Sequence, residues 1–275
     1  MVAGPSAGSG RGVEPAVRLD SVSKWFRGDG RSGRSVHALT RVTVDIENGE
    51  FVSFIGPSGC GKSTLLRLIG GLLEPDRGTV TVAGMAPDRA RRRKHFGFVP
   101  QQPALLPWRT VSDNVALLGS LNARAGAAGI DRAGQQELLE RVGLGGFADS
   151  LPRELSGGLQ QRVSIARAFA LEAPVLLLDE PFSALDEITR ADMRYLLLDL
   201  WSRAGSTAVF VTHSIPEAVA LSDRVVILGA SPGEVITTVD IPLARPRAEE
   251  IEDEPVFHQL VSQVRAALKQ GWTDR

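Results

Sequence analysis

The sequence has almost no cysteine and no long apolar run, and each absence excludes a class of protein. Cys60 is the only cysteine among 275 residues, which excludes an internal disulfide and a metal site built from several cysteines. The longest apolar stretches, such as residues 175–178, have the length of a strand and fall far short of a bilayer span. The first residues also lack the apolar block of a signal peptide. We therefore expect a cytosolic protein.

The sequence also lacks an excess of charge of either sign. Lys and Arg number 31 and Asp and Glu 32, a formal net charge of −1, so no overall positive field exists to hold nucleic acid or an anionic bilayer. A basic run between Arg89 and Lys94 contains no aromatic residue, and we interpret it as a solvated face. We expect no nucleic-acid partner, and any membrane attachment should go through a protein partner.

Short apolar segments alternate with helical patterns, which predicts an α/β fold. The expected strands are residues 18–26, 42–46, 51–55, 79–83, 96–99, 175–178, 208–211 and 225–228. Segments 175–178 and 208–211 are apolar throughout, as strands buried on both faces of a parallel sheet should be.

The same pass along the chain predicts its organisation. Residues 1–16 are rich in Gly, Ala, Ser and Pro and are expected to form a disordered leader. Residues 17–247 should form a single unit, because no motif recurs, with a helical subdomain at about 103–162. Residues 248–275 should form a helical appendage whose apolar stripe favours a packing role over a regulatory one; the stripe consists of Phe257, Leu260, Val261, Val264 and Leu268.

Residues 56–63 fit the phosphate-loop pattern G-x-x-x-x-G-K-[ST] between a predicted strand and a predicted helix, the context that the motif requires. Glycines let backbone N–H groups close around a phosphate, and the helix N-terminus adds a favourable dipole. Lys62 supplies a charge to the phosphates, and the Ser63 hydroxyl is a hard ligand suited to Mg²⁺. The residues expected to bind nucleotide here are Gly56, Pro57, Ser58, Gly59, Cys60, Gly61, Lys62, Ser63 and Thr64. Cys60 is either an inert filler or a thiol whose pKa the helix N-terminus lowers.

Two acids, Asp179 and Glu180, end the apolar strand at 175–178. Both carboxylates should emerge at the carboxyl edge of the sheet, where doubly wound folds bind ligands. Asp179 is placed to hold Mg²⁺, and Glu180 to polarise the attacking water as a general base.

Residues 155–162, Leu-Ser-Gly-Gly-Leu-Gln-Gln-Arg, resemble the signature motif of ABC-type ATPases, whose common form is L-S-G-G-Q. Other landmarks follow in that family's order. Phe26 resembles the aromatic that stacks on adenine, and Gln101 resembles the glutamine of the loop that joins the core to the helical insertion. Residues 183–186, which end in Asp186, resemble the loop that faces the opposite protomer, and His213 resembles the switch histidine that contacts the γ-phosphate.

The resemblance implies a P-loop NTPase fold: a RecA-like parallel core sheet with an antiparallel β edge, a helical subdomain and a C-terminal helix. It implies a homodimer in which Ser156, Gly157 and Gly158 complete the γ-phosphate site of the other copy. Catalytic roles are implied for Lys62, Gln101, Glu180 and His213, nucleotide contacts for Phe26 and Asp186, and Mg²⁺ ligation for Ser63, Gln101 and Asp179. The partners implied are a membrane permease and, indirectly, an extracytoplasmic substrate-binding protein, with the chain peripheral on the cytoplasmic face of the membrane.

Two residues depart from the family pattern. Leu159 stands where many members have glutamine, and Pro100 precedes Gln101 where a large apolar residue is common. The first leaves Ser156 and Gly158 intact, whereas the second bears on the hinge of the loop.

Segments 103–111, 232–236 and 242–247 resemble bacterial importers of nitrate, sulfonates and taurine, a pattern that importers of thiamine-precursor pyrimidines share. The rivals are an exporter subunit and a soluble ABC ATPase for DNA repair, chromosome structure or ribosome work; the latter usually has a long coiled-coil insertion or two ATPase units in one chain, and this sequence has neither. Trp108 directly follows the loop between Pro103 and Pro107. It is either a residue that fills the core of the helical subdomain or an anchor for the permease. His37, His95 and His258 are expected to be structural or surface residues.

Overall fold

The computed structural model describes residues 14–26, 35–123, 130–230 and 232–273. Its main sheet has the order β5 (Phe96–Val99), β6 (Val175–Asp179), β7 (Thr207–Thr212), β3 (Phe51–Ile55), β8 (Arg224–Leu228) and β9 (Val235–Asp240). Neighbouring strands are parallel except β8 and β9. The predicted parallel core with an antiparallel edge is confirmed.

Alternate residues of the central strands fill different cores, which explains why these strands are apolar throughout. Val175 and Leu177 of β6 enter the core shared with α1 (Lys62–Ile69), whereas Leu176 and Leu178 enter the core shared with the helical subdomain. Burial on both faces therefore replaces the usual alternation of apolar and polar residues.

A second, antiparallel sheet of three strands covers α1, in the order β2 (Val36–Ile46), β1 (Val17–Phe26) and β4 (Arg77–Val82). All eight predicted strands are present. Strand β9 was missed, because only Val239 of its six residues is buried and its apolar signal is weak. Residues 1–13 of the predicted leader lie outside the described residues, while Ala16 is buried against the second sheet, where its carbonyl accepts from the Ala83 N–H.

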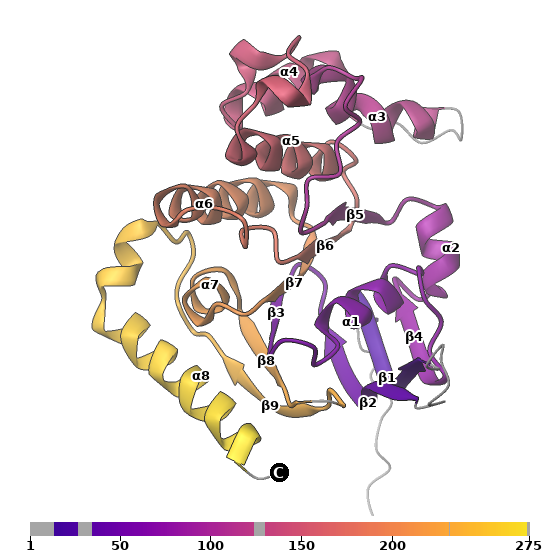
Figure 1. Cartoon of the computed structure of the whole chain (residues 1–275), viewed down its shortest axis with the longest axis vertical. Helices are drawn as coiled ribbons and strands as arrows, with labels where there is room; N and C mark the ends of the chain where they lie inside the picture. Colours follow the sequence, from indigo (N-terminus) through magenta and orange to yellow (C-terminus); the bar gives the residue numbers. More distant parts are fainter. Residues whose placement is uncertain (1–13, 27–34, 124–129, 231, 274–275) are drawn as a thin grey trace, which may run out of the picture.

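Helices α3 (Val111–Ala123), α4 (Arg132–Arg141) and α5 (Gly157–Phe169), with short turns at η1 (Gly145–Phe147) and η2 (Pro152–Glu154), form the upper layer in Figure 1. Helix α6 (Glu187–Ala204) lies between this layer and the sheet. The loop before α3 has no helix, as its prolines predicted. The basic run lies on and after α2 (Pro87–Arg92), where its side chains are exposed or half-buried.

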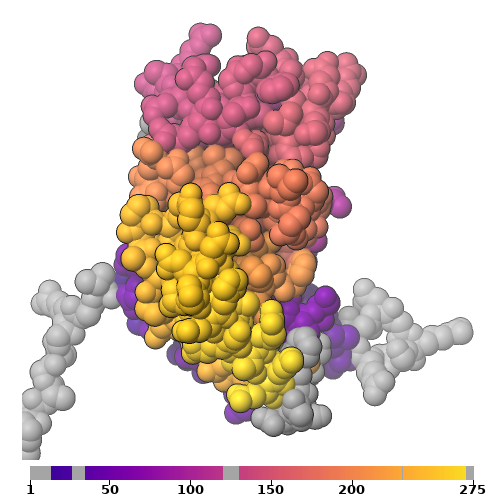
Figure 2. Space-filling view, turned by 90° about the vertical axis from the view of Figure 1, so that its left-hand side faces the viewer, coloured from indigo at the N-terminus to yellow at the C-terminus, as the bar shows by residue number. Residues whose placement is uncertain are grey.

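The chain ends with α7 (Ile215–Leu221), β8, β9, the short η3 (Glu249–Asp253) and α8 (Pro255–Thr273). Helix α8 runs along the outside of α7 and the β9 edge, and Figure 2 shows it spread over one face of the molecule. All five residues of the predicted stripe are buried in the core beneath it. None of the helices in the described ranges combines the length and the hydropathy that a membrane span requires.

Arg247 joins this C-terminal region to the sheet. Its side chain is fully buried and donates to carbonyl oxygens at the end of α7 and after β9, namely those of Val219, Ala220, Ser222, Ile241 and Leu243. Burial lowers the pKa of Arg247 to about 10, but the guanidinium stays charged near neutral pH.

Candidate functional site

Four neighbouring parallel strands end at one edge of the main sheet, and a residue singled out from the sequence follows each. Gln101 follows β5, Glu180 follows β6, His213 follows β7 and the phosphate loop follows β3. Ligands of open parallel sheets bind at this edge. The topology thus collects the predicted residues in one place.

The phosphate loop leads into the N-terminus of α1 through a glycine in the left-handed region. Gly61 has φ +94°, and a Cβ there would lie 2.6 Å from the carbonyl oxygen of Ala38, so only glycine fits. The Lys62 ammonium donates to the carbonyl oxygens of Gly56 (2.8 Å) and Pro57 (2.9 Å). Its charge is therefore held inside the loop, with Ser58 and Gly59 exposed at the rim.

Of the two interpretations of Cys60, its burial favours a residue that fills space in the loop. It is only 1% exposed, and burial raises the pKa of its thiol although the Lys62 ammonium acts to lower it. The hypothesis of a thiol with a lowered pKa is wrong, because desolvation outweighs the Lys62 charge and the hydrogen bonds from backbone N–H groups.

Ser63 and Asp179 meet across 116 residues of sequence: the Ser63 hydroxyl donates to Asp179 Oδ1 at 2.9 Å. Burial, with the neighbouring charge of Glu180, raises the pKa of Asp179. A desolvated carboxylate beside a hydroxyl gains from a hard divalent cation, so this pair fits Mg²⁺. No cluster of three His, Cys, Asp or Glu side chains that could hold a metal occurs in the described part of the chain, and a cation here would use water as well.

Glu180 and His213 face one another, with Glu180 Oε2 3.1 Å from His213 Nδ1. The backbone of Glu180 is left-handed (φ 45°), which is unusual for a residue with a Cβ. Its N–H donates to the carbonyl of Val211 on the next strand, and this bond fixes the turn that aims the carboxylate. Gln101 reaches the same turn, because its Nε2 donates to Ser183 Oγ at 3.2 Å and that hydroxyl donates to the Glu180 carbonyl at 3.0 Å.

The signature motif forms the exposed N-terminus of α5. Ser156 caps the helix by accepting from the Leu159 N–H, and Gly157 is also exposed. A Cβ on Gly158 would lie 3.1 Å from Thr189 Cγ2, so this end of α5 packs against the start of α6. The departure at Leu159 leaves the cap intact, since it contributes only its backbone N–H.

Asp186 caps α6 by accepting from both the N–H and the hydroxyl of Thr189, and these bonds lower the pKa of Asp186. Its carboxylate is already well bonded within the protomer. Phe26 ends β1, is 40% exposed and has the Lys24 ammonium 5.8 Å from its ring centroid.

Sequence reasoning missed Glu217, a buried carboxylate that accepts from the hydroxyl of Thr212, the residue before His213. A glutamate in the first turn of a helix is the usual capping pattern, so the sequence alone contains no signal for a second role. The solvated histidines are as expected: His37 and His258 are exposed.

Comparisons with known proteins agree with this geometry. The sequence model of the ABC transporter family matches residues 39–183. The taurine import ATP-binding protein TauB of Rhizobium johnstonii is 42% identical over 261 residues, which cover 92% of this chain and 96% of that protein. The aliphatic sulfonates import ATP-binding protein SsuB of Bacillus cereus is 39% identical over 255 residues, with 93% and 96% covered.

Solved structures agree as well. The ATP-binding cassette MJ0796, in a dimeric post-hydrolysis state bound to ADP and phosphate, superposes with a TM-score of 0.72 at 36% identity, over 83% of this chain and 100% of that one. The protein cbiO1 of Clostridium perfringens, part of the ABC transporter complex cbiONQ, gives a TM-score of 0.69 at 25% identity, over 93% and 98%. The chain therefore belongs to the ABC transporter family, and it is the ATP-binding, ATP-hydrolysing subunit of a transporter of that family.

Proposed function

We propose that this chain drives a bacterial importer of taurine, aliphatic sulfonates or a related small anion such as nitrate. One observation supports its role as the ATPase subunit: the phosphate loop, the Ser63–Asp179 pair and the Glu180–His213 pair lie together at the ends of adjacent strands. The substrate class rests on the two import proteins that the chain resembles over nearly its full length.

In the proposed mechanism the phosphate loop binds the β- and γ-phosphates through its N–H groups and Lys62. Ser63 and Asp179, with Gln101, would hold Mg²⁺, which would offset charge on the phosphate oxygens. Phe26 would stack on the adenine, since its ring is partly exposed at the end of β1.

Glu180 would then polarise the attacking water, and His213 would orient it and the γ-phosphate. The hydrogen bond between their side chains supports this division of roles, because it keeps the carboxylate and the imidazole at one point of the sheet edge. Hydrolysis of this kind depends mainly on positioning and on offsetting charge, so few groups are needed.

A second copy of the chain would complete each site through Ser156, Gly157 and Gly158. The exposed N-terminus of α5 supports this arrangement, since a helix N-terminus is suited to a phosphate. The related cassette MJ0796 is a dimer. ATP would thus be bound between two protomers, and the loop of residues 183–186 would face the partner copy.

A groove of about 430 Å³ beside the Gln101 loop would dock the permease. Its lining is mainly apolar and includes Leu72, Phe96, Phe98 and Leu118, and Arg91 and Lys94 line it as well. Trp108, on the same loop, is 73% exposed, which supports the anchor hypothesis over core filling. The subunit would work at the cytoplasmic face of the membrane, and the substrate-binding protein would act on it only through the permease.

The proposed ATPase mechanism is tested with Glu180→Gln, which keeps the shape of the side chain and removes the base. Affinity for ATP should change less than about threefold while turnover falls at least about 100-fold, and ATP should trap a dimer visible by size exclusion. Turnover near the parent value would remove Glu180 from this role.

For the substrate, ATP-dependent uptake of taurine, methanesulfonate and nitrate should be compared in vesicles that hold the complete transporter; uptake of none of them would refute the assignment.

A further inference from the structure

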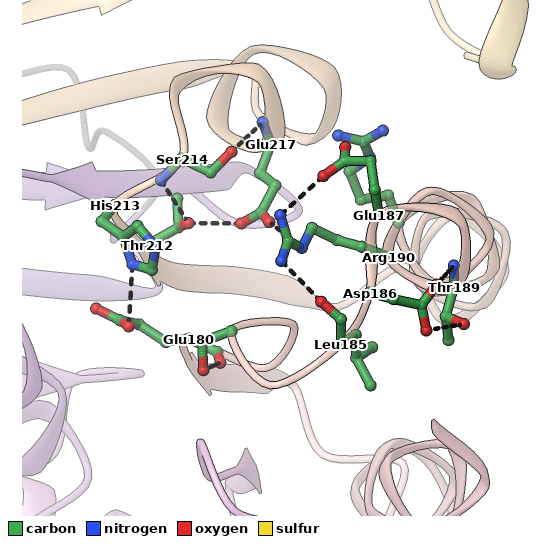
Figure 3. A network of polar contacts seen from close by, with 12 residues as sticks. Glu180, Leu185, Asp186, Glu187, Thr189, Arg190, Thr212, His213, Ser214 and Glu217 are labelled. Carbon is green, nitrogen blue, oxygen red and sulfur yellow. Dashed lines mark hydrogen bonds and ion pairs between the residues drawn. The ribbon is translucent and has the colours of Figure 1, made fainter. Parts of the chain in front are cut away.

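Glu217 is a buried carboxylate that has no role in the mechanism above. It lies in the first turn of α7 and is 5% exposed. Its Oε2 accepts a 2.5 Å hydrogen bond from the Thr212 hydroxyl, which itself accepts from the backbone N–H of Ser214 (Figure 3). Because Thr212 and Ser214 flank His213, Glu217 holds the backbone that carries the imidazole.

Arg190 of α6 lies on the other side of this carboxylate (Figure 3). Its guanidinium donates to the carbonyl of Leu185 at 2.7 Å and to Glu187 Oε2 at 3.0 Å. The remaining nitrogen, Nε, is buried, has no hydrogen-bond partner among the described residues and lies 3.9 Å from Glu217 Oε1. Arg190 is therefore fixed to the loop of residues 183–186 and faces Glu217 with its free donor.

The segment of residues 212–214 and the loop of residues 183–186 both contact Glu180. The segment of residues 212–214 reaches it through His213 Nδ1, and the loop of residues 183–186 reaches it through the Ser183 hydroxyl, which donates to the Glu180 carbonyl. A shift of either segment relative to the other would move the carboxylate or the imidazole. A displacement of these reacting groups by about 1 Å is enough to lower the rate of hydrolysis substantially.

We propose that Glu217 and Arg190 are positioning residues for ATP hydrolysis, which set the segment that carries His213 against the loop that follows Glu180. The pair touches neither the phosphate loop nor the Ser63–Asp179 pair in any contact described above. It acts on the rate through the placement of other groups. The inference rests on the roles proposed for Glu180 and His213.

The test compares Glu217→Gln, Arg190→Met and the double variant in steady-state ATPase assays and thermal melts of the full chain. Each single change should lower kcat by about 10- to 100-fold, because a misplacement of a reacting group by about 1 Å can cost about 100-fold, with KM for ATP within about threefold. Each single variant should also melt earlier, because a buried charge is left without its partner. The double variant leaves no such charge, so its melting temperature should return towards that of the parent while its kcat stays low.

Arg247→Met is the control, because it removes a buried arginine. The Arg247 side chain is fully buried and donates to the carbonyl oxygens of Val219, Ala220 and Ser222 near the end of α7, and neither Glu217 nor the loop of residues 183–186 is among its described partners. Its loss should lower the melting temperature and leave kcat within about twofold, in contrast to the about 10-fold or greater loss expected for Arg190→Met.

The proposal is overturned if the double variant regains the kcat of the parent along with its stability, or if Arg247→Met lowers kcat as much as Arg190→Met. A parent-like turnover of Glu180→Gln is a separate result, which would refute the mechanism on which the proposal rests.

Discussion

Trp108→Ala is expected to separate the stability of this subunit from its coupling to the permease. Trp108 is 73% exposed, so only about a quarter of its surface is buried within the protomer. A tryptophan side chain has up to about 250 Å² to bury, and at about 25 cal/mol per Å² that quarter stabilises the fold by less than about 2 kcal/mol. A core site emptied in the same way would cost about 3–5 kcal/mol.

The exposed three quarters are available to a partner. If they become buried in the permease, truncation should weaken docking by about 2–4 kcal/mol, the usual size of an aromatic hot spot, or roughly 30- to 1,000-fold in affinity. The basal ATPase of the isolated subunit should stay within about twofold of the parent, because Trp108 lies outside the sheet edge that carries the site.

The assay pairs a thermal melt of the isolated subunit with ATPase and transport measurements on the reconstituted complex. Trp108→Phe keeps an aromatic and should retain most of the stimulation by the permease, and Phe147→Ala removes another exposed aromatic of the helical subdomain as a control for general damage. A drop in melting temperature as large as a core deletion gives, or unchanged permease-dependent stimulation, would refute the reasoning.

Three further outcomes are expected. Lys62→Ala should weaken ATP binding by about 10- to 100-fold in a fluorescent-nucleotide titration, since a charged donor to phosphate is lost; equal affinities would contradict its role. Cys60 should react with maleimide at pH 7 at least about tenfold more slowly in the folded chain than in urea, because burial raises the pKa of the thiol; equal rates would show it to be exposed. Arg247→Met should lower the free energy of unfolding in a denaturant titration by about 3–5 kcal/mol and leave kcat per folded molecule unchanged; an unaltered midpoint would mean that the unpaired carbonyls find other donors.

Local patterns predicted the phosphate loop and the acidic pair, Asp179 and Glu180. A glycine-rich loop between a strand and a helix needs only neighbours in sequence, and an acidic pair that ends an apolar strand is placed by the strand itself. Parallel pairing then brings Gln101, Asp179, Glu180 and His213 to one edge. Gln101 and His213 were identified only through the resemblance to ABC-type ATPases, because a single glutamine or histidine after a strand has no local pattern of its own.

What the sequence did not predict depends on packing between distant segments. The 3.9 Å approach of Arg190 to Glu217 requires α6 and α7 to lie side by side. Whether Cys60 is exposed and whether Trp108 is buried are likewise decided by tertiary neighbours, and both alternatives stayed open until the structure gave 1% and 73%. Strand β9 carries one buried residue, too little for its pattern to be recognised.

Because the backbone at Glu180 is left-handed, the residue that would give the highest stability at this position differs from the residue that turnover needs. A residue with a Cβ in that region costs about 1 kcal/mol or more relative to glycine, so Glu180→Gly should relieve strain at the position where the proposed base is attached. Selection of this chain for heat resistance alone would therefore favour loss of the carboxylate, and a thermostable variant has to be screened for ATP turnover before its stability means anything for transport.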